Sequence, residues 1–286
     1  MRDLREAWAE LLARRSPLAA SLSIYTRVLD AWAEVPAAIV PLEWSATESR
    51  RTWAEGMPID AAAPPAIDPA AIEDLLGVAM EVVAEARDDA RPGLGRLAEA
   101  WDRGEVTPRS LLPTPGRISG LDMTPAIDDD ASAFLSVVAL RPSLEAYHDT
   151  IRPYLRDADW DRGRCPCCGA APGFAEVTEQ GHRRLACHVC GGAWTFTRLR
   201  CPFCGEAETR NLGRLDFEAA PDQGYFVSTC SSCRGYIKEL DRRVRWNGGP
   251  PVLEDWASPH VDLACERAGY RRPGWPVILA RPVSGT

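Results

Sequence analysis

Four short segments carry most of the information about the fold: Cys165-Pro-Cys-Cys-Gly169, Cys187-His-Val-Cys-Gly191, Cys201-Pro-Phe-Cys-Gly205 and Cys230-Ser-Ser-Cys-Arg-Gly235. Each segment holds a C-x-x-C pair, and together they contain nine of the ten cysteines of the chain. Ten cysteines scattered at random over this length would form fewer than about one such pair. The clustering therefore predicts that the four segments serve one structural purpose.

Metal binding is the purpose that this spacing favours. Two cysteines separated by two residues form a tight loop that points both sulfurs at one place, and a second pair completes a tetrahedron. A glycine after the second cysteine suits the left-handed conformation that closes such a loop, as at Gly169, Gly191 and Gly205. Arg234 stands at this place in the fourth segment, which predicts a slightly different turn without loss of the ligands. We therefore predict eight metal ligands: Cys165, Cys168, Cys187, Cys190, Cys201, Cys204, Cys230 and Cys233.

Sequential pairing of the four segments predicts two sites. It leaves positions 169–186 between the first two pairs and positions 205–229 between the last two, and both lengths fit a β-hairpin. Crossed or nested pairing is the alternative. Disulfides are another interpretation, but a disulfide within C-x-x-C is strained, and nothing in the sequence indicates an oxidising compartment. Four thiolates accept Zn²⁺ or a single iron, so the residues leave the metal open.

The other cysteines and the nearby histidines are expected to have structural places. Cys167 lies inside the first pair, where we expect a thiol that faces outward; a substitute ligand is the alternative. Cys265 is expected to be a small core residue. His182 and His188 are expected on the surface or around the ligands, because eight thiolates already fill two sites.

Residues 1–160 read as helices separated by prolines. We expect helices over residues 3–15, 16–34, 68 to about 83, 93–101, from 107 and from 130. Asp68-Pro69 offers an N-cap followed by a proline in the first turn. Pro142 should interrupt or end the last of these helices, because proline has no backbone N–H to donate.

After residue 161 the sequence changes to short β-prone runs. The expected strands cover residues 175–178, 183–186, 194–199 and 225–228, and helical spacing returns over 254–268. Such strands have little to pack against, so we expect bound metal to supply the missing stability. The predicted fold class is α+β, with an N-terminal all-α helical domain, two small rubredoxin-like or zinc-ribbon metal modules of four cysteines each and a C-terminal helix. The predicted boundaries are residues 1–160, 161–200, 201–250 and 251–286.

Composition excludes several classes of protein. No stretch approaches the ~18 apolar residues of a membrane span, and the N-terminus lacks a secretory signal, so we expect a soluble intracellular protein. Positions 1–160 carry 16 basic and 27 acidic side chains, net −11, and the rest carry 17 and 14, net +3. The acidic half could attract a basic surface on a partner, or it could only keep the protein soluble.

Several of these motifs resemble those of the formate dehydrogenase accessory protein family, FdhE. The resemblance lies in Cys165-Pro-Cys-Cys-Gly-Ala-Ala-Pro172, Arg184-Leu-Ala-Cys-His-Val-Cys190, Trp194, Arg198, Cys230-Ser-Ser-Cys-Arg-Gly-Tyr-Ile-Lys238, Glu254-Asp-Trp-Ala257, Val261-Asp-Leu-Ala264 and Ala268-Gly-Tyr270. It covers roughly residues 160 to 272. The resemblance implies a cytoplasmic assembly factor that acts on the catalytic subunit of a respiratory formate dehydrogenase before twin-arginine export. It also implies two rubredoxin-like iron centres, with zinc as the alternative.

The residues themselves favour a protein that is not an enzyme. The expected sites have four ligands each and no open position, and the sequence has no nucleophile–base signature or phosphate-binding glycine loop. We therefore expect no catalytic residues and no cofactor site beyond the two metal ions. The predicted partner is the formate dehydrogenase catalytic subunit, without membrane insertion, and a homodimer stays open.

Two other functions compete with the assembly factor. A zinc ribbon that binds nucleic acid is the first, but a pI near 5.2 and the lack of a basic-aromatic stripe argue against it. A rubredoxin-like electron carrier is the second, because a four-thiolate iron site can cycle by one electron.

Overall fold

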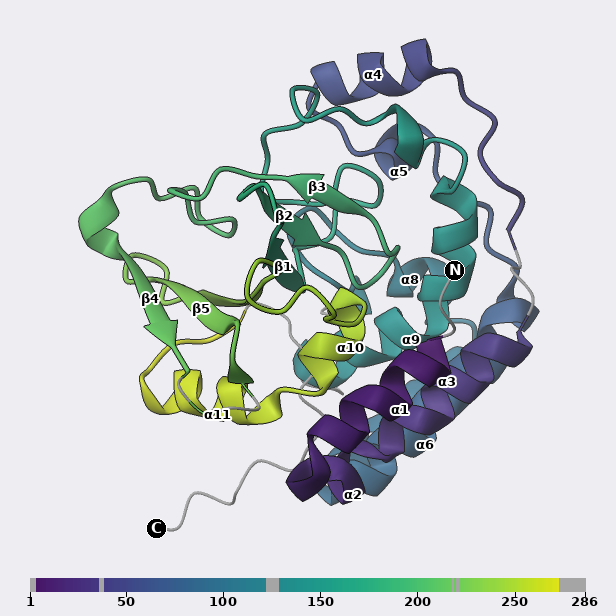
Figure 1. Ribbon diagram of the computed structural model, residues 1–286. Coiled ribbons are helices and arrows are strands. Elements are labelled where there is room, and N and C mark those ends of the chain that lie inside the picture. Colours follow the sequence, from purple (N-terminus) through teal and green to yellow (C-terminus); the bar gives the residue numbers. More distant parts are fainter. Residues whose placement is uncertain (1–3, 36–38, 122–128, 218, 220–221, 273–286) are drawn as a thin grey trace.

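The computed structural model describes residues 4–35, 39–121, 129–217, 219 and 222–272. The N-terminal half consists of helices: α1 (Leu4–Arg14), α2 (Ala19–Leu22), α3 (Ile24–Glu34), α4 (Ala46–Ala54), α5 (Ile59–Ala62), α6 (Pro69–Ala86), α7 (Arg91–Asp102), α8 (Pro108–Leu111) and α9 (Asp129–His148). Helix α3 contacts both α1 and α6, and α6 also contacts α9 (Figure 1). The expected α+β fold class is confirmed, because these helices pack beside a sheet that carries the cysteine segments.

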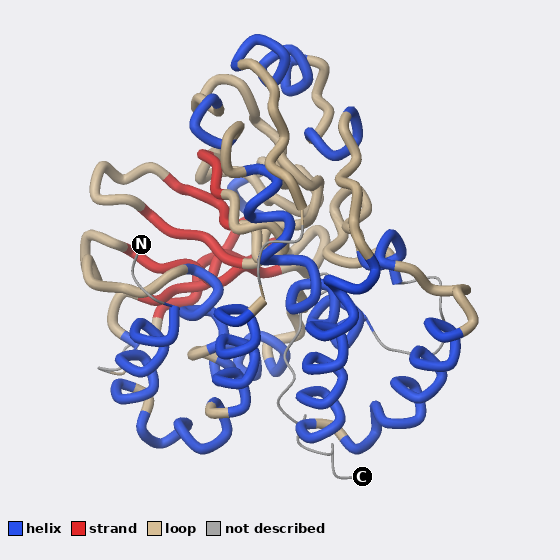
Figure 2. The backbone as a smooth tube through the Cα atoms, turned by 90° about the vertical axis from the view of Figure 1, so that its right-hand side faces the viewer, coloured by secondary structure: helices blue, strands red, loops and turns tan. Residues whose placement is uncertain are grey.

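Six strands form one mixed sheet next to the helices (Figure 2). The strands are β1 (Phe174–Val177), β2 (Arg183–Ala186), β3 (Ala193–Thr195), β4 (Leu212–Asp216), β5 (Tyr225–Cys230) and β6 (Tyr236–Asp241). Their order in the sheet is β3-β2-β1-β6-β5-β4. All neighbours are antiparallel except β1 and β6, which are parallel.

The sheet is built from two ribbons with the same chain path. The first ribbon runs from a cysteine pair through β1 and β2 to a second cysteine pair and β3. The second ribbon runs from a cysteine pair through β4 and β5 to a second cysteine pair and β6. The parallel contact of β1 with β6 joins the first strand of one ribbon to the last strand of the other. The two ribbons are thus copies of one structural unit within a continuous sheet.

The expected helices at the N-terminus are present, with one break. The segment expected as a helix over residues 16–34 is a 3-10 turn followed by α2 and α3, which Ser23 separates. The Ser23 hydroxyl donates to the Ala20 carbonyl at 2.7 Å, a local bond that competes with regular helix geometry. The cap at Asp68 is as expected, because its carboxylate accepts from the Ala70 N–H at 3.1 Å at the start of α6.

Pro142 does not interrupt α9, contrary to the expectation from the sequence. In a regular helix, residue 142 would donate its N–H to the carbonyl of Val138, and proline cannot. The indole N–H of Trp32 on α3 donates to that carbonyl instead, at 2.8 Å. A partner from another helix therefore satisfies the acceptor that the proline leaves free.

In the second half, the strands over 174–177 and 183–186 lie where the sequence predicts them, and β3 is shorter than expected. Strands β4 and β6 were missed by the sequence patterns. The helix expected over 254–268 is two helices, α10 (Pro251–Trp256) and α11 (Pro259–Arg267), because Pro259 can only begin a helix. The chain after residue 272, part of the predicted C-terminal segment, lies outside the described residues.

The first ribbon and the helices share one hydrophobic core, and several buried apolar residues of the second ribbon lie in two smaller clusters. The main cluster of buried residues extends from Trp8 and Phe134 in the helices to Cys165 and Leu185 in the first ribbon. Trp256 of α10 stacks on Tyr25 of α3, with ring centroids 4.7 Å apart. The expectation that the strands have little to pack against is therefore wrong for the first ribbon. The segment boundaries at residues 160, 200 and 250 stay a proposal, and the described contacts cross them.

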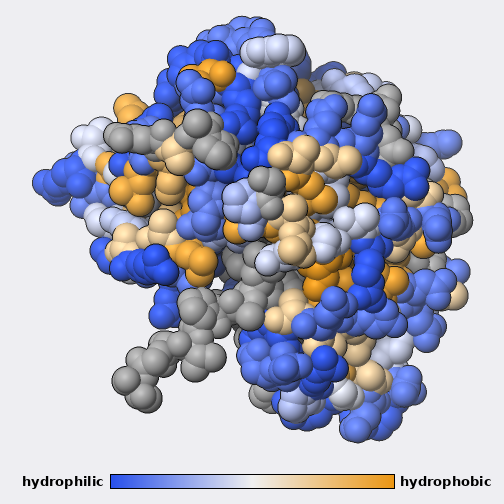
Figure 3. Space-filling model, turned by 60° about the horizontal axis from the view of Figure 1, so that its bottom comes forward, coloured by the Kyte–Doolittle hydropathy of each residue, from blue (hydrophilic) through white to orange (hydrophobic). Residues whose placement is uncertain are grey.

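Hydrophobic and hydrophilic side chains are mixed on the surface. On the face seen in Figure 3, hydrophobic side chains form separate groups among hydrophilic ones. Within the described ranges, no helix combines the length and the apolar character needed to cross a lipid bilayer.

Candidate metal centres

Four sulfurs meet at the end of the first ribbon. Cys165 and Cys168 precede β1, and Cys187 and Cys190 lie between β2 and β3. The sulfurs of Cys165 and Cys190 are 3.5 Å apart, as are those of Cys168 and Cys187. All four lie within 4.8 Å of one another. Sequential pairing of the first two segments is therefore the arrangement in the structure.

The second ribbon holds an equivalent group. The Cys201 and Cys233 sulfurs are 3.7 Å apart, and so are those of Cys204 and Cys230. All four again lie within 4.8 Å of one another. We call the two groups the first centre and the second centre.

The sulfur spacing fits a tetrahedral metal ion. Zinc–sulfur bonds of about 2.3 Å in a tetrahedron place the sulfurs about 3.8 Å apart, close to the spacing in both centres. A disulfide would require about 2.0 Å between sulfurs, and all ten cysteines are free. The disulfide interpretation is therefore wrong for this structure, and the donor set fits a thiophilic ion.

The four cysteine loops share one backbone geometry. In each loop, the N–H of the first cysteine donates to the carbonyl five residues later, as from Cys165 to Ala170 and from Cys230 to Gly235, at 2.8 to 2.9 Å. Gly169, Gly191 and Gly205 have φ between 72° and 79°, and Arg234 has φ of 57°. Arg234 adopts the same left-handed conformation as the glycines. The glycine N–H groups also donate to the carbonyl of the first cysteine in their loops at 3.0 to 3.1 Å, and within the described residues Arg234 makes no such bond, so the fourth turn differs slightly, as expected.

The two centres differ in exposure. All four cysteines of the first centre are buried, whereas Cys204 and Cys233 of the second centre are exposed. The equivalent cysteines of the first centre, Cys168 and Cys190, are 4% and 0% exposed. One ion site therefore lies inside the protein, and the other opens to solvent.

Helices from the first half of the chain cover the first centre. The indole N–H of Trp53 and the backbone N–H of Ile59 both donate to the Pro166 carbonyl at 3.0 Å. The Asp60 N–H donates to the Cys167 carbonyl at 3.0 Å. These bonds fix the first cysteine loop against α4 and α5, and no linear motif in the sequence indicated them.

Two arginines from the region of α9 contact the other loop of the first centre. Arg141 donates to the His188 carbonyl at 2.7 Å, and Arg152 donates to the Cys190 carbonyl. Burial disfavours the charge of Arg152, but the negative charges of the Cys190 and Cys167 thiolates and of Glu145 raise its pKa. These two guanidinium groups place positive charge beside a group that gains negative charge when its thiols ionise.

The residues near the ligands lie partly as expected. His182 is on the surface, whereas His188 is buried, with its Nε2 3.3 Å from Asp255. Burial lowers the pKa of His188 to about 4, so its imidazole is neutral at pH 7. Cys265 is buried in a small apolar cluster, as expected. Cys167 is only 2% exposed, so the outward-facing thiol predicted from the sequence is wrong.

A buried network of charges connects the sheet to the last two helices. Lys238, the only lysine of the chain, is fully buried, with its Nζ 2.7 Å from carboxylate oxygens of both Asp255 and Asp262. Arg272 lies 2.9 Å from Asp255 and 2.6 Å from Asp262. Burial disfavours ionisation of Asp255, but Arg272 and Lys238 hold its pKa below the usual range. The sequence showed these residues only as parts of the motif that resembles FdhE, without a role.

Glu206 ties together the two loops of the second centre. Its carboxylate accepts from the Ser232 hydroxyl at 2.5 Å, the Asn211 amide at 2.9 Å and the Glu208 N–H at 2.8 Å. These hydrogen bonds, that from Ser232 first, lower the pKa of Glu206 to about 2. The second centre is therefore supported by a hydrogen-bond network that faces solvent, whereas the first centre is supported by helices.

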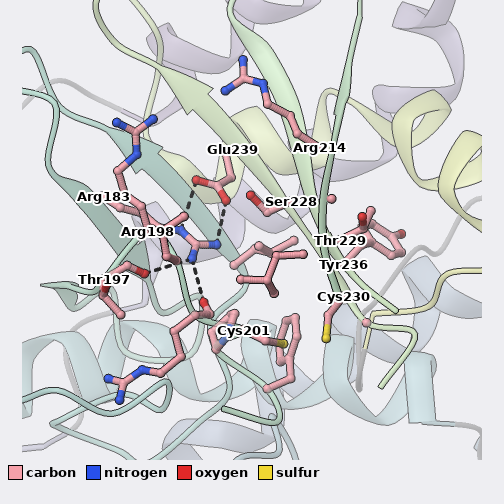
Figure 4. A pocket seen from close by; sticks show the side chains of 18 of the residues that line it. Arg183, Thr197, Arg198, Cys201, Arg214, Ser228, Thr229, Cys230, Tyr236 and Glu239 are labelled. Atoms are coloured by element: carbon pink, nitrogen blue, oxygen red, sulfur yellow. Dashed lines mark hydrogen bonds and ion pairs between the residues drawn. The ribbon is translucent and has the colours of Figure 1, made fainter. Parts of the chain in front are cut away.

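A pocket of about 700 Å³ lies between the ribbons, beside the second centre (Figure 4). Phe226 and Ile237 of the sheet are among the residues that line it, as are Cys201 and Cys230 of the second centre. Arg183 pairs with Glu239 at 2.7 Å within it, so this arginine is neutralised by its own chain.

The two repeated ribbons and their sulfur groups define a class of proteins in which a mixed β-sheet, packed against helices, carries two groups of four cysteines.

No protein-family profile matches the chain. A protein FdhE homolog from Aquifex aeolicus is 31% identical over 150 residues, which are 50% of this chain and 50% of the relative. A protein FdhE homolog from Stutzerimonas stutzeri is 34% identical over 124 residues, 42% of this chain and 39% of the relative. The matched part thus spans half or less of the length of these curated relatives.

The crystal structure of the FdhE protein from Pseudomonas aeruginosa has the same fold over almost the whole chain. The two align with a TM-score of 0.62 and 22% identity, covering 98% of this chain and 96% of that one. The chain is thus similar to FdhE proteins in sequence over up to half of its length and in fold over almost all of it, and the resemblance noted in the sequence is confirmed.

Proposed function

We propose that the eight cysteines bind two metal ions, four to each ion, and that the chain is a non-catalytic accessory protein of formate dehydrogenase. In this proposal the chain acts in the cytoplasm, where it binds the catalytic subunit of a respiratory formate dehydrogenase during maturation. Similarity to FdhE homologs supports the accessory role. The identification of the formate dehydrogenase catalytic subunit as the partner rests on what the resemblance to the FdhE family implies.

The closed geometry of the two sulfur groups carries the proposal. Four protein sulfurs stand at tetrahedral spacing in each group, so a bound ion has all of its positions occupied by the chain. Catalytic zinc sites instead keep one position open for water or substrate. A fully enclosed ion crosslinks the chain or exchanges electrons, and it does not activate a substrate.

Iron is the metal that the family resemblance favours, and zinc is the alternative. Four thiolates at this spacing accept either ion, because neither demands another ligand type. When bound, each ion would crosslink the two cysteine loops of its ribbon. The loops of the first ribbon are separated by positions 169–186, and those of the second by positions 205–229.

Metal analysis combined with partner capture tests the proposal. Protein purified under reducing conditions without added metal should contain two equivalents of iron or zinc, and paired Cys→Ser variants of either centre should retain one. The metal-loaded chain should capture a purified formate dehydrogenase catalytic subunit. Protein without bound metal, or a metal-loaded chain that leaves the catalytic subunit unbound, would contradict the proposal.

Exposure of the second centre favours one alternative, a rubredoxin-like electron carrier. Cys204 and Cys233 reach solvent, and an exposed four-thiolate iron site can exchange an electron with a partner. Reversible bleaching of an iron-loaded chain, coupled to turnover of a reductase, would support this alternative. An accessory protein with structural ions would show no such turnover.

A further inference from the structure

We propose that an arginine-bearing segment of a partner protein covers the second centre, as arginines of this chain cover the first. This inference rests on the proposed function, which supplies the partner, the catalytic subunit of formate dehydrogenase. It adds a location on this chain and a chemistry for the contact.

The internal repeat identifies which atoms correspond. Cys187-His-Val-Cys-Gly191 in the first ribbon corresponds to Cys230-Ser-Ser-Cys-Arg234 in the second, since both lie between the second and third strands of their ribbons. Both loops close with an N–H to carbonyl bond over five residues, 2.8 Å long from Cys187 and 2.9 Å long from Cys230. His188 therefore corresponds to Ser231, and Cys190 corresponds to Cys233.

In the first ribbon, this loop is capped by guanidinium groups. Arg141 donates to the carbonyl of His188, and Arg152 donates to the carbonyl of Cys190. The loop lies in the interior as a result, with His188 1% exposed and Cys190 fully buried. The protein thus uses arginine both to satisfy loop carbonyls and to place positive charge next to thiolates.

In the second ribbon, the corresponding loop is bonded to Glu206 and Asn211, but no arginine of the described parts of the chain caps its carbonyls. Ser231, Ser232 and Cys233 are exposed. Within the described residues, no hydrogen bond reaches the carbonyl oxygens of Ser231 and Cys233. Arg234 does not serve as the cap, because its guanidinium points to the Gly269 carbonyl and stacks over the ring of Tyr270.

The charge of this surface selects a cationic partner. Four thiolates around a divalent ion carry a net charge of about −2. The carboxylate of Glu206 accepts from Ser232 in the same loop, and Glu208, two residues further along, is exposed. A guanidinium can donate to two carbonyls or to a carbonyl and a carboxylate at once, because its donors form a planar fork. Arginine therefore matches both the open carbonyls and the negative charge, as it does in the first centre.

A charge-reversal variant tests the location. Ser231→Arg with Glu208→Arg adds positive charge beside the second centre, and Ser21→Arg with Glu73→Arg makes the same charge change on exposed positions of α2 and α6. Affinity for the purified catalytic subunit should fall by about tenfold or more in the first variant and stay unchanged in the second. Metal analysis of both variants should show two loaded centres, which separates loss of binding from loss of metal.

A protection measurement tests the coverage. With the metal-loaded chain, the partner should slow the release of the more labile ion to a chelator, because the segment covers Cys204 and Cys233. Crosslinking should place arginines of the catalytic subunit next to this loop. Wild-type binding in the Ser231→Arg, Glu208→Arg variant, or unchanged ion release in the complex, would overturn the inference while leaving the proposed function standing. Failure of the wild-type chain to bind the subunit would overturn both.

Discussion

The two ribbons follow one plan, but only the first has all four of its grouped cysteines buried by its own chain. The first ribbon lies under α4, α5 and α9, so its sulfurs belong to the main hydrophobic core. The second ribbon lies on the side of the sheet away from these helices (Figure 1). Two of its four grouped cysteines, Cys204 and Cys233, are exposed. The same cysteine loop can thus serve as a buried crosslink or as an accessible site, depending on what packs against it.

This difference implies different consequences for the two centres. Loss of a buried ion would leave four thiols inside an apolar core, and the helices that contact their loops would lose their hydrogen-bond partners. Loss of the exposed ion would release two loops into water, which can hydrate their backbone groups. We therefore expect the first centre to maintain the fold and the second to contact other molecules.

The largest expected effect comes from removing one ligand in each centre. Cys168→Ser and Cys204→Ser change equivalent cysteines, and each variant should lose one metal equivalent. Since structural zinc binding is worth about 10–16 kcal/mol, both should be destabilised, and Cys168→Ser should lose several kcal/mol more. Urea unfolding with metal analysis measures both quantities. Equal stabilities for the two variants would remove the distinction between the centres.

The buried charge network beneath the sheet gives the next effect. Lys238→Met removes one of the two cations, Lys238 and Arg272, that pair with the buried carboxylates of Asp255 and Asp262, which should cost about 3–5 kcal/mol. Arg214→Ala removes the exposed pair of Arg214 with Asp216 in the second ribbon, which should cost about 1 kcal/mol or less. Chemical denaturation of both variants tests the ratio. A Lys238→Met variant as stable as the wild type would show that the network does not stabilise the fold.

Ion release should separate the two centres in time. A chelator added to the metal-loaded chain should remove one equivalent about tenfold or more faster than the other, because only the second centre is reached without local unfolding. The Cys204→Ser variant should lack the fast phase, and Cys168→Ser should retain it. Release of both ions in a single phase would contradict this expectation.

The smallest expected effect concerns the glycines that close the loops. Gly205→Ala should cost about 1–2 kcal/mol, because its φ of 79° is left-handed and no neighbouring atom obstructs the added methyl. Gly191→Ala should cost about 1 kcal/mol more, because its methyl would lie 3.0 Å from Glu145. Thermal melting of the two metal-loaded variants measures the difference. A larger loss for Gly205→Ala would mean that crowding at the first centre is not important.

The candidate ligands could be predicted because their signal is local. Two cysteines and a glycine within five residues already describe the loop, and the structure brings the eight cysteines together in the sequential order that we favoured. The repeat of the ribbons was missed because β4 and β6 carry mixed side chains that do not alternate clearly. The continuation of α9 through Pro142 was missed because it depends on a distant residue. The indole of Trp32, which donates to the Val138 carbonyl that the proline leaves free, lies more than one hundred residues from it in the sequence.

The sequence alone established where eight sulfurs stand in four tight loops and that the first half of the chain is helical, since both follow from contacts between near neighbours. Only the tertiary structure showed that Arg141, Arg152 and Trp53 cover one centre while Cys204 and Cys233 of the other face solvent. Burial is a property of what packs against a loop, and the residues that pack here are remote in sequence. The loops therefore specify the two sites, and the packing of the helices makes them different.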